Sequence, residues 1–121
     1  MEEGAQIRAV IQTYFDGMYE SSSTKTQEAF HPDAWISGDL PHGPQQMTVA
    51  QFADFVAAQQ PSPQAQGLPA RLDVVSLDIA GHTAVARVRD DYLGMTFLDT
   101  LSFIKQNDRW CIMNKLFHVE S

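Results

Sequence analysis

Apolar and polar residues alternate along most of the C-terminal half of the chain. Four segments show this alternation: 72–79, 83–92, 96–104 and 110–119. A period of two is typical of strands that bury one face. Short turn sequences around Gly81, Gly94 and Asn107 separate the segments, and such turns favour antiparallel hairpins. The pattern therefore predicts a four-stranded antiparallel meander.

The N-terminal part of the chain follows helical spacing instead. The apolar positions on one face are Ile7, Val10, Ile11, Tyr14 and Met18. Spacings of three and four residues are typical of an amphipathic helix. We therefore predict a long helix from about Glu2 to Glu20.

Two capping-box patterns, in which a threonine precedes a glutamine by three residues, predict two shorter helices. They start at Thr24 and Thr48. The first helix should end near His31, because Pro32 disfavours a helical residue before it. The second should end near Gln59.

The remaining segments predict one more strand and two loops. Residues 34–38 read as a short strand, and the turn-rich residues 41–44 follow it. Residues 60–70 hold three prolines and one glycine, which predicts a surface loop and a candidate lid. Helices segregated from an antiparallel sheet define the α+β class. We expect one domain over residues 1–121.

The acidic composition argues against nucleic acid or an anionic membrane as a partner. The formal net charge is −7, whereas both partners attract basic surfaces. The single cysteine, Cys111, excludes an internal disulfide and favours a reducing compartment. No signal peptide or long apolar run is evident, so we expect a cytoplasmic protein. Four histidines lie far apart without metal-ligand spacing, so we expect no metal site.

The turns also predict how the strands pair, and they place Asp90 opposite Asp99 on the buried face. Polar residues gather at one end of this face: Asp73, Asp90, Tyr92, Asp99, Asn114 and His118. The apolar positions include Val75, Leu77, Phe97, Leu101, Trp110 and Leu116. Arg87, Arg89 and Lys115 fall on the other face, and a one-residue slip would bury the arginines. A concave wall that is half polar and half apolar predicts a small-molecule pocket.

Several segments together resemble the nuclear-transport-factor-2-like (NTF2-like) superfamily. They are His31-Pro32-Asp33-Ala34, Ala84-x-Ala86-x-Val88, Phe97-x-Asp99 and Arg109-Trp110-x-Ile112-x-Asn114-Lys115. Within the superfamily the chain is most similar to the group labelled putative lumazine-binding, close to the SnoaL-like polyketide cyclases. The resemblance covers essentially the whole chain.

The resemblance implies a cone-shaped domain that forms a homodimer. In this superfamily a curved antiparallel sheet packs on a long N-terminal helix and two shorter helices, and the outer sheet face usually makes the dimer. Its members include ketosteroid isomerases, dehydratases, epoxide hydrolases, cyclases and proteins without catalysis. The fold alone therefore does not define an activity.

Asp90 and Asp99 are the central candidates for catalysis. Two carboxyl groups in contact do not both ionise readily, so one should hold its proton to a higher pH and form an acid–base pair. The alternative is structural: one aspartate lies in water at the rim, or bonds a loop backbone or Asn114. Asp99 is the stronger candidate because Phe97 and Leu101 flank it.

Two other residue types offer groups that move or hold protons. His118 is either a proton shuttle beside Asp99 or an exposed rim residue. Tyr14 and Tyr92 can each offer a hydroxyl to a ligand oxygen, as a tyrosine does in isomerases that the chain resembles, or they serve only as amphipathic core residues.

The remaining candidates would line the ligand pocket. They are Asn114, Trp110, Phe97, Leu101, Trp35, His31 and Asp33. Related enzymes often place a catalytic Asp or His near the last two, although Asp33 can equally brace the turn after Pro32. The tryptophans are most simply core or pocket wall.

We expect a domain that binds a compact, mostly apolar ring ligand carrying polar oxygens. One alternative is a cofactor-free acid–base enzyme of the isomerase, dehydratase or polyketide-cyclase type that uses Asp99. A second alternative is a non-catalytic dimerisation module. Side chains alone can supply this acid–base chemistry, so no cofactor is expected.

Overall fold

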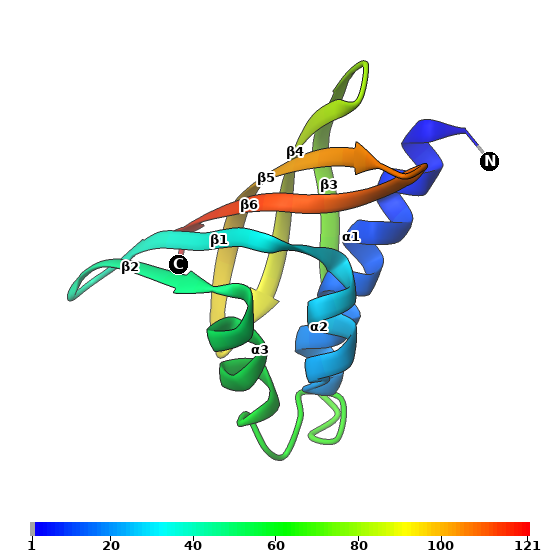
Figure 1. The fold of residues 1–121 in the computed structure, drawn as a ribbon. Coiled ribbons are helices and arrows are strands. Elements are labelled where there is room, and N and C mark those ends of the chain that lie inside the picture. The colour runs from blue at the N-terminus through cyan, green and yellow to red at the C-terminus, as the bar shows by residue number, and fades with distance from the viewer. Residues whose placement is uncertain (1) are drawn as a thin grey trace.

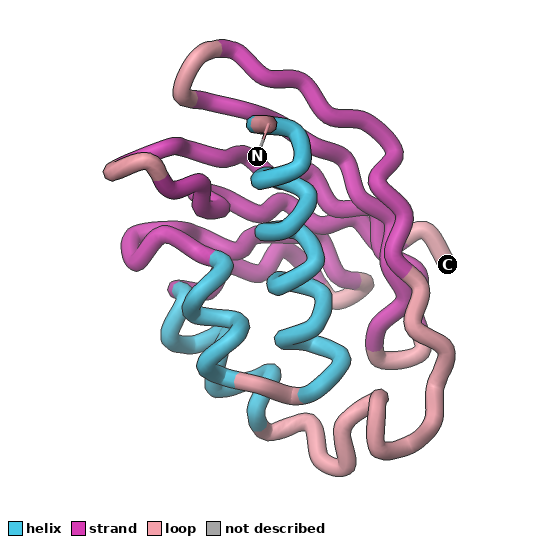
Figure 2. Tube along the Cα trace, turned by 90° about the vertical axis from the view of Figure 1, so that its right-hand side faces the viewer, coloured by secondary structure: helices cyan, strands magenta, loops and turns pink. Residues whose placement is uncertain are grey.

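A computed structural model describes residues 2–121 and confirms the α+β class. The elements are α1 (Glu3–Glu20), α2 (Ser23–Ala29), β1 (Phe30–Leu40), β2 (Gly43–Thr48), α3 (Val49–Ala57), β3 (Leu72–Ala80), β4 (Thr83–Tyr92), β5 (Met95–Gln106) and β6 (Arg109–Val119). They build one six-stranded sheet in the order β2-β1-β6-β5-β4-β3, with the helices on one side of it (Figures 1 and 2). Every pair is antiparallel except β1 with β6, which is parallel.

The three predicted helices are present, with one difference in capping. Helix α1 buries the predicted apolar stripe and ends at Ser21, which adopts a left-handed conformation with φ of 53°. Helix α2 is capped by Ser22, whose side chain accepts a bond from the Lys25 amide, and not by Thr24. The capping box of Thr48 with Gln51 is confirmed.

The sheet has one strand more than predicted. Residues 43–48, expected to begin in a loop, form β2 and pair with β1. Pro44 is tolerated there because β2 is an edge strand and needs no second row of hydrogen bonds. Strand β1 also extends well beyond the predicted residues 34–38.

The β4–β5 hairpin confirms the buried face but not the exact pairing. Its turn is Leu93-Gly94, both with positive φ, and it places Tyr92 opposite Met95. Asp90 therefore pairs with Phe97 rather than with Asp99. The shift is two residues, and side chains repeat with a period of two, so Asp90 and Asp99 remain diagonal neighbours on one face.

A β-bulge in β6 reverses the predicted faces of that strand's second half. Phe103 pairs with Ile112 as predicted, but Ser102 pairs with Asn114, so one extra residue enters β6 at Met113. Lys115 is consequently buried, where an outward position was predicted. Three residues predicted on the inner face are instead exposed on the outer one: Asn114, Leu116 and His118.

A second bulge, at Val75 in β3, moves the start of that strand out of phase. Val74 pairs with Val88, and Ser76 pairs with Arg87. Val75 is therefore half exposed and Asp73 is exposed, which corrects their predicted inner positions.

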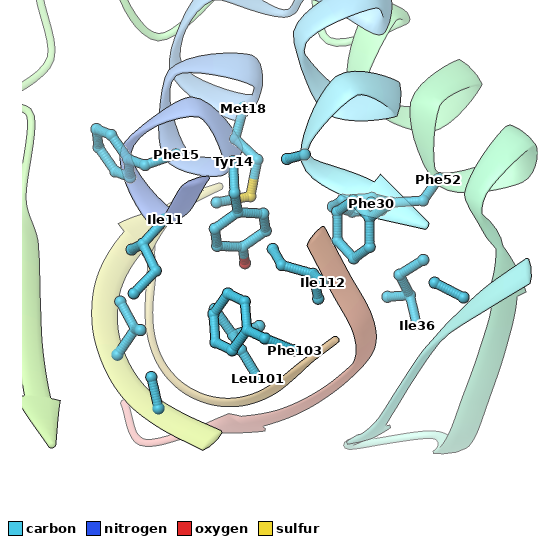
Figure 3. Packing of buried hydrophobic residues seen from close by; sticks show 14 of the residues in the cluster. Ile11, Tyr14, Phe15, Met18, Phe30, Ile36, Phe52, Leu101, Phe103 and Ile112 are labelled. Carbon is cyan, nitrogen blue, oxygen red and sulfur yellow. The ribbon is translucent and has the colours of Figure 1, made fainter. Parts of the chain in front are cut away.

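The core lies between the concave sheet face and the helices. Figure 3 shows the ring of Tyr14 at its centre, with β4, β5 and β6 curving around it. Tyr14, Leu101 and Ile112 have no exposed surface. No helix within residues 2–121 is long and apolar enough to cross a membrane.

Gly38→Ala tests how closely β1 approaches β6. A Cβ at this position would overlap the ring of Phe117, so the ring or the strand would have to move. We expect the free energy of unfolding to fall by about 1–3 kcal/mol, measured by urea unfolding with circular dichroism. Asp39→Ala, at the next and exposed position, is the control, with a change within about 0.5 kcal/mol. Equal stabilities of the two variants would contradict the close approach.

Candidate functional site

Three ionisable side chains form a diagonal row across neighbouring strands on the concave face. Asp90 lies on β4, Asp99 on β5 and Lys115 on β6. Asp99 is diagonal to Asp90 through the pair Asp90–Phe97, and diagonal to Lys115 through the pair Asp99–Phe117. Their exposed fractions are 1%, 0% and 6%. Burying such groups is costly, so their partners define the chemistry of the site.

Tyr14 links the long helix to this row. Its hydroxyl donates a hydrogen bond of 2.7 Å to Oδ2 of Asp99. Burial raises the pKa of Tyr14 well above the ordinary value, and the nearby carboxyl groups of Asp99 and Asp90 act in the same direction. Tyr14 therefore stays a neutral hydrogen-bond donor to Asp99.

The pKa of Asp90 is raised beside Asp99. Burial, with the hydrogen bond and the negative charge of Asp99, raises the pKa of Asp90 to about 9, against a smaller opposing effect of Lys115. With both groups ionised, Oδ2 of Asp90 and Oδ1 of Asp99 would have no hydrogen-bond partner within residues 2–121. A proton on Asp90, donated to Asp99, removes this repulsion. At neutral pH Asp90 is therefore protonated.

Lys115 sits in a cage of aromatic rings. Its Nζ lies 4.6 Å from the ring centroid of Phe52, 4.8 Å from that of Tyr14 and 5.7 Å from that of Phe117. These distances are within the range of cation–π attraction. Among the described residues, no hydrogen bond and no ion pair within 4.0 Å involves Nζ.

A cavity of about 170 Å³ opens beside the row. Its wall is mainly apolar: Met18, Ile36, Leu40, Met47, Phe52, Phe55, Leu93, Met95, Phe97 and Phe117. Four polar residues complete it: Gln45, Asp90, Tyr92 and Lys115. An apolar hollow with a few convergent polar groups is typical of small-molecule sites.

Tyr92 presents a second polar group without a partner. Its hydroxyl oxygen is buried and makes no hydrogen bond within the described chain. Burial raises the pKa of Tyr92, so the hydroxyl is a neutral donor that can serve a ligand oxygen.

A neighbouring cavity of about 280 Å³ lies under the loop of residues 60–70. It shares Met18, Tyr92, Leu93 and Met95 with the first cavity, and Leu68 belongs to its wall. The hydroxyl of Tyr19 donates a hydrogen bond of 2.7 Å to the Leu68 carbonyl and so holds the loop. The loop therefore borders the second cavity, and its role as a lid stays a prediction.

Of the predicted site residues, Asp90, Tyr92 and Phe97 line the first cavity. Asp99, Tyr14 and Leu101 are buried beside it. Asp90 is therefore the aspartate of the pair that lines the cavity, and Asp99 is fully buried.

The structure does not bring the other predicted residues to the cavity. Asn114 and His118 face outward because of the β6 bulge, and Trp35 is 45% exposed on the outer face. Trp110 is buried but donates its indole N–H to Glu3. His31 and Asp33 interact only locally at the start of β1, where the Asp33 amide donates to Nδ1 of His31.

The main residues that sequence reasoning missed are Lys115, Phe117 and Phe52. The β6 signal was ambiguous, because Ile112 and Met113 are consecutive apolar residues that fit either phase of the alternation. Within residues 2–121 there is no cluster of three His, Cys, Asp or Glu side chains arranged to hold a metal ion.

The curved sheet closed by three helices is the NTF2-like fold, and solved structures agree. The chain superimposes on an NTF2-like protein of unknown function from Silicibacter pomeroyi with a TM-score of 0.86 and 20% identity, covering 96% of this chain and 94% of that one. A second such protein, from Shewanella baltica, gives a TM-score of 0.85 and 25% identity over 98% and 94% of the two chains.

A family model identifies the family to which the chain belongs. The model of the putative lumazine-binding family matches residues 2–118, and the chain belongs to this family. A curated protein named aldolase FrzH, from a Cladobotryum species, is 28% identical over 113 residues, which cover 91% of this chain and 88% of that protein.

Asp90→Asn tests, through the pH dependence of stability, whether the folded chain holds a proton on Asp90. The pKa of Asp90 is about 9 when folded and about 3.9 when unfolded, so the folded chain holds a proton that the unfolded chain releases. The contribution of this proton to the free energy of unfolding is complete below about pH 4. It is lost as the pH rises towards 9, with a slope of up to about 1.4 kcal/mol per pH unit. The wild type should therefore lose stability relative to Asp90→Asn across this window in urea unfolding.

The control for this experiment is Asp91→Asn, at the next and exposed position. It should follow the wild-type pH dependence. Parallel curves for the wild type and Asp90→Asn would show that Asp90 holds no proton at neutral pH.

Proposed function

We propose that the first cavity binds a compact, mostly apolar ring compound with a carbonyl group, and that Asp90 with Asp99 transfers a proton on it. The observation that carries this proposal is the buried, diagonal pair of Asp90 and Asp99, of which Asp90 lines an apolar cavity and has a raised pKa. Such a pair offers an acid and a base in one place, which suits reactions of the isomerase, dehydratase or cyclase type.

The geometry supports a division of roles. Asp90 reaches the ligand, because it lines the cavity. Movement of its proton to Asp99 leaves the Asp90 carboxylate as the base, which takes a proton from the carbon next to the carbonyl. Tyr14 stabilises the charge on Asp99 in the resting pair. The free hydroxyl of Tyr92 is available to the carbonyl oxygen, where charge develops.

The relative named an aldolase supports the same class of chemistry. An aldol reaction starts with removal of a proton beside a carbonyl group, and it needs an acid for the oxygen that becomes the alcohol. Both steps are within reach of one carboxyl pair, and neither requires a cofactor.

Hydrogen–deuterium exchange of ring ketones tests this proposal. Cyclohexanone, indan-2-one and 2-tetralone in D₂O report removal of the α-proton by loss of its NMR signal. We expect the wild type to accelerate exchange of at least one ketone, and Asp90→Asn to slow it by about 10²–10⁴-fold, the usual contribution of a general base. Asp91→Asn should exchange as the wild type does. Equal rates for Asp90→Asn and the wild type would rule out Asp90 as the base.

The outer sheet face supports a second proposal, that the chain forms a homodimer. Trp35 on β1, Val85 on β4 and Leu116 on β6 are 45%, 40% and 58% exposed, and all point away from the core. Apolar side chains on a sheet face covered by no helix favour association with a second copy.

Light scattering of the wild type and Leu116→Asp tests the dimer. We expect the wild type at the mass of two chains and the variant at the mass of one, because a charge at the centre of an apolar interface is strongly unfavourable. Leu68→Asp, exposed on the loop of residues 60–70 and not on the sheet, should remain dimeric. A monomeric wild type would contradict the proposal.

A further inference from the structure

We infer that Lys115 anchors an acidic oxygen of the ligand, and that the cavity prefers enolic 1,3-dicarbonyl rings bound as their enolate anions. This inference rests on the proposed function, because it places the ligand in the same cavity. It adds the chemical class of the compound and assigns a binding role to a residue that the sequence placed on the opposite face.

The aromatic cage holds the ammonium group without using its hydrogen-bonding capacity. Phe52, Tyr14 and Phe117 attract the charge through their ring faces, and a ring face is not an oxygen acceptor. An ammonium group has three N–H donors. Lys115 is 6% exposed and lines the cavity, so these donors have only the cavity in which to find an acceptor.

The described residues therefore give the ammonium group of Lys115 no hydrogen-bond acceptor. Buried polar groups are almost always hydrogen-bonded, and an unpaired charge is the most costly exception. The carboxylate of Asp99 balances the charge from a diagonal position but makes no ion pair within 4.0 Å with Lys115. A ligand oxygen with negative charge would supply the missing acceptor and form a charge-assisted hydrogen bond.

The carboxyl pair is compatible with an anion because Asp90, which lines the cavity, has a raised pKa. Asp90 meets the ligand as a protonated acid, so it donates a hydrogen bond instead of repelling the ligand. The enolate of a 1,3-dicarbonyl has two oxygens on alternate carbons. One oxygen can face Lys115 while the other faces Asp90 or the free hydroxyl of Tyr92, since all three residues line one cavity.

The surroundings favour this ionic role over a covalent one. A lysine that attacks a carbonyl carbon must first lose its proton. The three ring faces around Nζ of Lys115 attract an ammonium group and offer no such attraction to a neutral amine. The anchor is therefore an ammonium group that binds oxygen and forms no imine.

A matched pair of bicyclic compounds tests the inference. 4-Hydroxycoumarin is an enolic 1,3-dicarbonyl that ionises below neutral pH, and coumarin has the same ring without the acidic oxygen. Isothermal titration of the wild type at pH 7.5 should give an affinity at least about tenfold higher for 4-hydroxycoumarin. In Lys115→Met, which keeps an unbranched side chain, the two affinities should become similar, through loss of 4-hydroxycoumarin binding alone. Asp91→Asn, at an exposed position outside this cavity, should keep the preference, and circular dichroism checks the fold of both variants.

The outcomes distinguish failure of the inference from failure of the proposed function. Equal wild-type affinities for the two coumarins would overturn the anchor, while the ketone exchange experiment would still decide the role of Asp90. Binding of neither compound would overturn the anchor and the proposed cavity together. A mass gain on Lys115 after borohydride reduction with the ring ketones would replace the ionic role by a covalent one. If Lys115→Met fails to fold, the two affinities of the wild type, for 4-hydroxycoumarin and for coumarin, still test the inference.

Discussion

The burial of three ionisable side chains in one diagonal row is the constraint on which the rest of this structure depends. Asp99 is stable there because Tyr14 brings a hydroxyl from α1. Lys115 needs rings from α1, α3 and β6 together. The helices are thus more than a cover for apolar surface, because their positions relative to the sheet determine whether the charges have partners. An error of a few ångströms in that packing would leave a charge unpaired, at a cost of several kcal/mol.

Much of this arrangement could be predicted from local signals in the sequence. Alternation and turn residues give the meander, and helical spacing gives α1 and the inward direction of Tyr14. The pairing of Asp90 was predicted two residues away from its true position, yet the prediction of its face was confirmed. A slip of two preserves the side on which a side chain lies, whereas a slip of one inverts it.

The other parts of the fold and of the site depend on features that the alternation of apolar and polar residues does not encode. A bulge adds one residue without changing the composition of a strand, so the inward turn of Lys115 was not predictable from the spacing. The parallel pairing of β1 with β6 joins segments far apart in the chain, and the edge strand β2 exists only because β1 offers it a partner. These are tertiary effects that override local preference.

The extra residue at Met113 has a consequence for comparisons among relatives. If a related chain lacks it, the residue aligned with Asn114 or His118 would face the cavity, and the residue aligned with Lys115 would face the solvent. Two relatives with nearly identical C-terminal strands could then have pockets lined by different residues of that strand. Ligand specificity in this family would evolve by a change of strand length as readily as by substitution, and an alignment that closes the gap would conceal the change.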